Sequence, residues 1–239
     1  MSVGYPVAII SSVKIAELHD WQFDPAQAMI LQRQLAARVS RSDKVTEPRF
    51  IAGVDIAVGK AGGMAAGAVV VLSYPELELV ETRVAHGKLD FPYILGLLSF
   101  REAPLTLAAC EQLTVVPDVV IVDGHGIAHP RRMGLACHLG LFLDIPTIGC
   151  AKSLLCGRHG KPDEQPGSTA EIVDKGETIG AALYTRLGTK PVYVSIGHKI
   201  DLQNTVRWVL ACCRVIVCRN RPGWHIRRLA ANWSKREAM

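Results

Sequence analysis

The amino-acid sequence predicts an α/β fold: a mixed five-stranded sheet flanked by helices, in one domain over residues 1–239. An apolar run followed by two strand-length segments with short turns indicates an antiparallel meander. The segments after it alternate between strand and helix, which favours parallel pairing through right-handed crossovers. With 239 residues, 49% of them hydrophobic, the chain is long enough for one full core.

The first half supplies a helix and the meander. Residues 20–40 place apolar side chains at helical intervals among Gln and Arg, which predicts an amphipathic helix. The run F-I-A-G-V-D-I-A-V from Phe50 to Val58 predicts a strand buried on both faces, which ends at a loop over 59–63. Strands over 66–72 and 77–85 complete the meander.

The second half supplies the parallel strands. Residues 94–100 look strand-like, helices are expected over about 99–113 and 131–143, and strands over 119–122 and around 147–148. Gly, Pro and charged residues predict a loop over 156–167. After it we expect a hairpin, with strands over 178–187 and 191–196, and a helix over 201–213 capped by Asp201.

Composition limits the classes of protein. No run of about 18 uncharged apolar residues is present, so we expect no membrane span. Residues 1–10 lack the pattern of a signal peptide, and we expect a cytoplasmic protein. The cysteines lack C-x-x-C spacing, which argues against structural zinc, and we expect most to be buried reduced thiols. They are Cys110, Cys137, Cys150, Cys156, Cys212, Cys213 and Cys218.

Positive charge gathers near the end of the chain. The net charge is +5, and the stretch from Arg207 to Arg236 carries eight basic residues and no acid. Such a tail suits a polyanion such as nucleic acid. A solvated face without a partner explains the tail equally well, so charge alone does not decide the function.

Two aspartates stand where apolar side chains would be expected. Asp55 lies inside the first predicted strand, where an unpaired carboxylate is costly to bury. Asp123 ends the run P-D-V-V-I-V-D, at the carboxyl end of a predicted parallel strand, where open α/β sheets bind ligands. If the strands are neighbours, protonation of one acid or a bound cation must relieve their repulsion. Mg²⁺ suits such a pair, although a lone Asp at a strand end more often caps a turn.

Further candidates lie close by in the sequence. Glu102 could complete a metal site or orient water, although acids are ordinary in the first turn of a helix. In D-G-H-G-I-A-H-P-R-R, His129 could contact phosphate or move a proton, and Arg131 or Arg132 could bind phosphate. Lys152, after a strand, suits a phosphate contact or is an ordinary surface lysine.

An aromatic tip is predicted between two elements. The segment Phe91-Pro92-Tyr93-Ile94 is of the kind that can enter a base stack where a base has been extruded. A packed turn is the commoner explanation for a Pro-Tyr pair.

The motifs from Phe50 to Lys152 resemble bacterial endonuclease V. They include G-V-D, L-S-Y-P-E-L-E-L-V-E, F-P-Y-I, L-L-S-F-R-E-A-P, V-D-G-H-G-I-A-H-P-R-R-M-G, H-L-G-L-F-L-D-I-P-T-I-G and A-K-S-L-L-C-G, in the family's order. The resemblance implies an RNase H-like fold. It implies a Mg²⁺-dependent endonuclease, with Mn²⁺ as a substitute, that acts on DNA containing deaminated bases. The bond cut would be the second phosphodiester 3′ to deoxyinosine, leaving a 5′-phosphate.

The resemblance also implies roles for residues. Asp55, Glu102 and Asp123 would bind the metal, and His129 would assist there as a catalytic residue. The remaining positions would bind substrate: the wedge residues Pro92, Tyr93 and Ile94, the pocket residues Gly96, Gly124 and Gly126, and also Lys152 and His225.

The chain departs from the family in two places. Leu95 stands where the wedge usually has a second proline, which should loosen the turn. After G-H-K-I at 197–200, the usual R-x-P-E-P-T-R segment is missing, and only His225 with the following Ile-Arg-Arg-Leu lines up. The resemblance therefore covers about residues 20–213, and we expect the divergent stretch 214–239 to be poorly ordered.

Two other functions remain open. A hypoxanthine- or inosine-binding protein without catalysis would fit an altered C-terminal segment, and the same acids could serve an inosine-specific ribonuclease. We expect a monomer without a membrane partner in each case.

Overall fold

A computed structural model describes residues 13–58 and 64–213. The divergent stretch 214–239, with His225 and Cys218, and the predicted loop 59–63 lie outside the described residues. The strands are β1 (Phe50–Val58), β2 (Met64–Ser73), β3 (Leu79–Lys88), β4 (Val119–Val122), β5 (Thr147–Ala151), β6 (Thr169–Asp174), β7 (Glu177–Leu183) and β8 (Val192–His198). The helices are α1 (Pro25–Ala36), α2 (Leu98–Cys110), α3 (Leu135–Leu143) and α4 (Leu202–Cys212).

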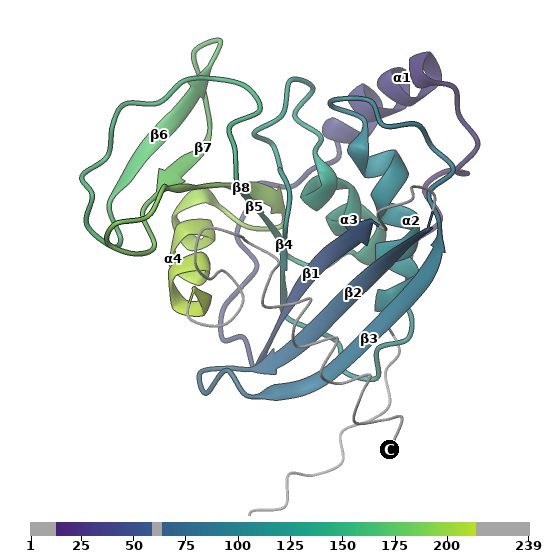
Figure 1. Ribbon diagram of the computed structural model, residues 1–239, viewed down its shortest axis with the longest axis horizontal. Helices are drawn as coiled ribbons and strands as arrows, with labels where there is room; N and C mark the ends of the chain where they lie inside the picture. The colour runs from purple at the N-terminus through teal and green to yellow at the C-terminus, as the bar shows by residue number, and fades with distance from the viewer. Residues whose placement is uncertain (1–12, 59–63, 214–239) are drawn as a thin grey trace, which may run out of the picture.

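The described strands form one mixed sheet, which Figure 1 shows, in the order β3-β2-β1-β4-β5-β8-β7-β6. The predicted meander is confirmed, because β1 pairs antiparallel with β2 and β2 with β3. The predicted parallel half is confirmed by the pairs β1–β4 and β4–β5. The mixed α/β class is therefore correct.

The strand count was wrong, since the sheet has eight strands and not five. The predicted hairpin is β7–β8, but β8 also pairs antiparallel with β5, so the hairpin extends the main sheet. Strand β6 was missed because its segment T-A-E-I-V-D lies at the sheet edge and only Ile172 is buried, so it carries little apolar signal. The hairpin β6–β7 is the upper left part of Figure 1.

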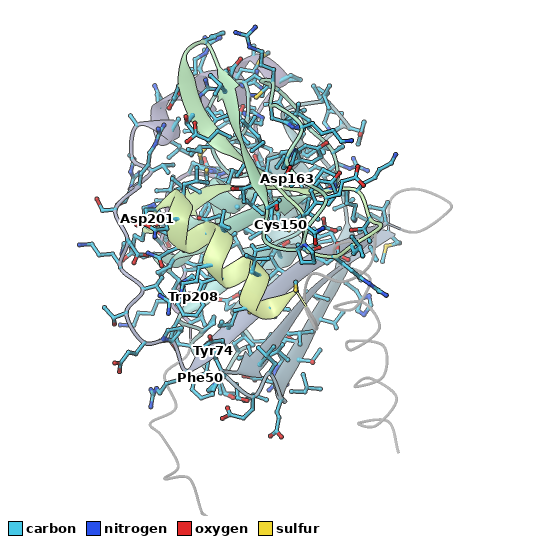
Figure 2. The ribbon with its side chains drawn as sticks, turned by 90° about the vertical axis from the view of Figure 1, so that its left-hand side faces the viewer. Phe50, Tyr74, Cys150, Asp163, Asp201 and Trp208 are labelled. Atoms are coloured by element: carbon cyan, nitrogen blue, oxygen red, sulfur yellow. The ribbon has the colours of Figure 1, made fainter. Side chains whose placement is uncertain are left out.

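Strand β1 is apolar because both of its faces are covered. Ile51 belongs to the core that includes Trp208 of α4, and its neighbour Ala52 belongs to the core that includes Leu107 of α2. Alternate side chains of a strand point to opposite faces, so one continuous apolar run serves both cores. In Figure 2, α4 lies across the sheet with Trp208 toward Tyr74, and the ring centroids of these two residues are 5.3 Å apart.

Helix boundaries follow local chemistry. Helix α1 begins after Asp24, whose side chain accepts hydrogen bonds from the backbone N–H groups of Ala26 and Gln27 in a capping box. Helix α4 begins after Asp201, which caps it as predicted. The strand-like character of 94–100 was wrong, because α2 already begins at Leu98. Helix α3 begins at Leu135, four residues later than predicted, after a loop that carries the predicted site residues.

None of the helices in residues 13–58 and 64–213 combines the length and apolarity needed to cross a bilayer. The prediction of buried thiols is confirmed for most of the described cysteines, which are free. Those buried are Cys110, Cys137, Cys150 and Cys212.

Candidate active site

The two predicted aspartates meet between two inner strands of the sheet, at the carboxyl end of β4. Strands β1 and β4 are parallel neighbours with Val54 opposite Val122, so Asp55, the next residue of β1, lies beside Asp123, which directly follows β4. Both side chains are nearly buried, and the carboxyl groups are in hydrogen-bond contact with each other. The prediction that separate strands bring these acids together is confirmed.

Burial and the facing Asp55 carboxyl raise the pKa of Asp123 to about 7, although Lys152 opposes the shift. The Lys152 ammonium, at the end of β5, lies 2.7 Å from Oδ2 of Asp123. Two carboxyl groups face one ammonium group here, so the site attracts a further cation. Carboxylate oxygens of this kind fit a hard divalent ion such as Mg²⁺.

A cavity of about 350 Å³ opens above this pair. Several predicted residues line it together: Asp55, Tyr93, Gly96, Glu102, Asp123, Gly124, His129 and Lys152. Glu102 reaches it from the second turn of α2. Among the described residues no three His, Cys, Asp or Glu side chains are grouped as a metal site, so the structure brings together two of the three predicted metal ligands.

His129 is held by two hydrogen bonds. Its Nδ1 accepts from the backbone N–H of Arg131 at 3.1 Å, so Nε2 carries the proton and donates to the Gly96 carbonyl oxygen at 3.0 Å. Burial, reinforced by the charge of Arg131, lowers the pKa of His129 to about 4. The imidazole ring is therefore neutral, and its two hydrogen bonds connect the Gly96 loop to the backbone of Arg131.

The predicted wedge is divided between the surface and the core. Tyr93 and Leu95 are 72% and 70% exposed, and both line the cavity. Ile94 instead packs against the cluster of Phe91 and Leu97, and neither Ile94 nor Pro92 lines the cavity. The exposed apolar tip is thus formed by the tyrosine and by the leucine that replaces proline.

The glycines of D-G-H-G-I-A-H-P-R-R have different surroundings. Gly124 lines the cavity. Gly126 does not, because its backbone lies against β8, where an added Cβ would come within 1.9 Å of the Ile196 carbonyl oxygen. Gly134 is equally crowded, since a Cβ there would meet the His125 carbonyl oxygen at 2.2 Å. These glycines allow the loop to pack directly on neighbouring backbone.

The adjacent arginines differ as well. Arg132 pairs with Asp174 at 2.8 Å and with Glu177 at 2.6 Å, which ties the loop to the β6–β7 hairpin. Arg131 donates instead to the Gly96 carbonyl oxygen and to the Oε1 atom of Gln32. Of the two candidates for phosphate, only Arg131 lacks a carboxylate partner within the described part of the chain.

Sequence reasoning missed Gln32. Its amide donates to the carbonyl oxygens of Gly96 at 3.0 Å and Met133 at 2.6 Å, and it is 1% exposed. The signal was present, because Gln32 shares the buried stripe of α1 with Ala28 and Leu35. A glutamine on such a stripe indicates hydrogen-bond partners that the helix itself does not supply.

The comparisons with known proteins agree with one another. The family model described as Endonuclease V matches residues 33–219. Endonuclease V of Gloeobacter violaceus is 51% identical over 200 residues, 82% of this chain and 81% of the relative. Endonuclease V of Dehalococcoides mccartyi is 46% identical over 203 residues, 85% of this chain and 91% of the relative.

Solved structures are similar over most of the chain. The crystal structure of endonuclease V from Streptomyces avermitilis has a TM-score of 0.80 and 35% identity, covering 96% of this chain and all of that one (100%). Endonuclease V of Ciona intestinalis, in complex with DNA containing an inosine followed by a ribo-adenosine, has a TM-score of 0.70 and 29% identity. That match covers 89% of this chain and 97% of the Ciona chain.

Proposed function

The chain belongs to the endonuclease V family, and we propose that it is a Mg²⁺-dependent repair endonuclease that nicks DNA beside deoxyinosine. The observation that carries the proposal is the contact between Asp55, within β1, and Asp123, at the carboxyl end of the parallel strand β4. The Ciona relative bound to inosine-containing DNA supports the substrate class. The proposed bond is the second phosphodiester 3′ to the lesion, with a 5′-phosphate product.

The acids suit the metal by their chemistry. Asp55 and Asp123 would hold it, with Glu102 as a third ligand from α2 or as the group that orients water. A bound divalent ion would activate water and neutralise charge that develops on the phosphate. Mn²⁺ also accepts oxygen ligands and would substitute.

Other residues of the cavity position the strand. Lys152 is proposed to contact the scissile phosphate once a metal ion takes over its role as the cation beside Asp123. Tyr93 and Leu95, as exposed apolar side chains, would fill the gap left by an extruded base. Gly96 and Gly124 would let the base approach the backbone, and His129 would act by holding the Gly96 loop rather than by ligating metal.

The test is strand cleavage by the wild-type protein. Duplex oligonucleotides with deoxyinosine or deoxyadenosine at one position are incubated with Mg²⁺, and the product length and 5′ end are determined. We expect cleavage at the second phosphodiester bond 3′ to the deoxyinosine. It should occur only in the strand that contains inosine and only when Mg²⁺ is present. The Asp123→Asn variant should be inactive, whereas Asp118→Asn, at the other end of β4, should remain active.

Two results would overturn the proposal, and each would indicate a different function. Selective binding of the inosine strand without product at any metal concentration would assign a binding protein instead of an enzyme. Preferential cutting of inosine in RNA would assign a ribonuclease with the same acids.

A further inference from the structure

We propose that Arg131 and Arg33 form a binding site for a backbone phosphate of the substrate strand, at the rim of the cavity. The inference rests on the proposed function, because it assigns a second contact to the strand that enters this cavity. The sequence motifs indicated neither a role for Arg33 nor the hydrogen-bond partners of Arg131.

The first argument is the set of partners of Arg131. Its guanidinium donates from Nε to Gln32 and from Nη2 to the Gly96 carbonyl oxygen at 2.7 Å, both of them neutral acceptors. No described residue accepts a hydrogen bond from its Nη1 atom or offers it a carboxylate. The adjacent Arg132 shows the alternative, since two carboxylates neutralise it.

The second argument is the position of Arg33. It follows Gln32 on α1, it is exposed, and within residues 13–58 and 64–213 it has no ion-pair partner. The side chain of Gln32, the preceding residue, holds the Arg131 guanidinium, which brings the two arginines close together. Burial, together with the positive charge of Arg33, lowers the pKa of Arg131, in agreement with this arrangement. Like charges held close without an acid attract an anion, and an arginine fork suits phosphate oxygens.

The third argument is that the Arg131 guanidinium is held by residues that line the cavity. Gln32 and Gly96, which hold the Arg131 guanidinium, both line the cavity with Asp55 and Asp123. Gly96 has φ +81°, and a Cβ added there would come within 2.9 Å of Nη2 of Arg131. The glycine therefore permits the close approach of the guanidinium to a residue that lines the cavity.

A structural explanation also exists for each arginine, and the experiment separates the two. A cation in the last turn of α1 stabilises the helix dipole, and Arg131 could serve only to fasten the Gly96 loop. Those roles affect thermal stability. Phosphate binding affects affinity for nucleic acid and its dependence on salt, because each neutralised phosphate releases counterions.

The experiment measures binding by fluorescence anisotropy with EDTA present, so that no strand is cut. Wild type, Arg33→Gln, Arg131→Gln and the double variant are titrated with inosine-containing and undamaged duplexes over a range of KCl concentrations. The control is Arg49→Gln, which removes an exposed cation at the opposite end of β1. Thermal melting is recorded for every variant.

We expect each single variant to weaken binding by roughly three- to tenfold, equally for both duplexes. The slope of log K against log salt should fall by about 0.9 per lost phosphate contact on duplex DNA, and the control should leave it unchanged. Because Arg33 is exposed and has no ion-pair partner among the described residues, Arg33→Gln should weaken binding with little change in the melting temperature.

An unchanged affinity and salt slope in Arg33→Gln and Arg131→Gln would overturn the inference, as would an equal loss in Arg49→Gln. The outcome for the proposed function is read separately, from wild-type cleavage with Mg²⁺. A wild type that binds both duplexes through these arginines but never cuts would refute the enzyme and keep the phosphate site.

Discussion

The two ends of β4 carry the same kinds of residue in different electrostatic settings. At the amino end, Asp118 accepts hydrogen bonds from the backbone N–H groups of Arg49 and Phe50 at 2.8 and 2.9 Å. Lys199 and Asp144 pair nearby at 2.6 Å. At the carboxyl end, Asp123 pairs with Lys152 at 2.7 Å but also faces Asp55.

The pKa values separate the two ends. Lys199 lowers the pKa of Asp144, whose side chain is 73% exposed. The pKa of Asp123 is raised to about 7 despite a lysine at the same distance, because burial and a second carboxyl outweigh one ammonium. An Asp–Lys pair is therefore ordinary in itself, and the second buried acid is what distinguishes the candidate active site.

The largest contrast should be in activity. Asp123→Asn removes a proposed metal ligand and should reduce inosine-specific nicking by about 10³-fold or more, since electrostatic groups of this kind stabilise the transition state by several kcal/mol. The same change at Asp118 should leave nicking within about twofold. Single-turnover nicking rates check both expectations. An equal loss of activity in the Asp118 and Asp123 variants would contradict a functional difference between the two ends of β4.

The two lysines should differ next. Lys152→Met removes the proposed phosphate contact and should lower the nicking rate by about 10²-fold. Lys199→Met, which removes the exposed pair with Asp144, should have an effect close to that of an ordinary surface change. Nicking rates at saturating Mg²⁺ are compared. Full activity of Lys152→Met would show that Lys152 takes no part in cleavage.

Stability should respond in the opposite order. Asp118→Ala deprives two backbone N–H groups of a charged acceptor and should lower the free energy of unfolding by roughly 1–2 kcal/mol. Asp123→Asn removes a buried repulsive charge and should not lower it. Urea denaturation in the absence of metal measures both, and a stability loss confined to Asp123→Asn would contradict the assignment.

The smallest effect is a pH dependence of the metal-free protein. The folded-state pKa of Asp123 is raised from 3.8 to about 7. The folded state therefore holds a proton that the unfolded state releases, and this contribution is present below about pH 4 and is lost as pH rises toward 7. The free energy of unfolding of the wild type, minus that of Asp123→Asn, should therefore decrease as the pH rises from about 4 to about 7. A difference that stays constant with pH would show that Asp123 is not protonated.

The carboxyl end of β4 was more predictable from sequence than the rest of the molecule. Asp55 and Asp123 were evident because an acid within an apolar run needs an explanation, whereas the pairing of their two strands stayed a condition until the β1–β4 register was known. Gln32 was missed because its partners come from loops far away in the chain. The division between Arg131 and Arg132 was also hidden, since it depends on the β6–β7 hairpin, whose edge strand carries a weak apolar pattern.

The backbone packing of the loop between β4 and α3 limits how this protein could change over generations. Gly126 and Gly134 abut main-chain atoms, which cannot rotate away as a side chain can, so even alanine requires the loop or β8 to shift. Selection would therefore remove most substitutions at these two glycines. New preferences for damaged bases would then have to arise at exposed positions of the cavity such as Tyr93 and Leu95, where a change in side-chain size meets less steric resistance.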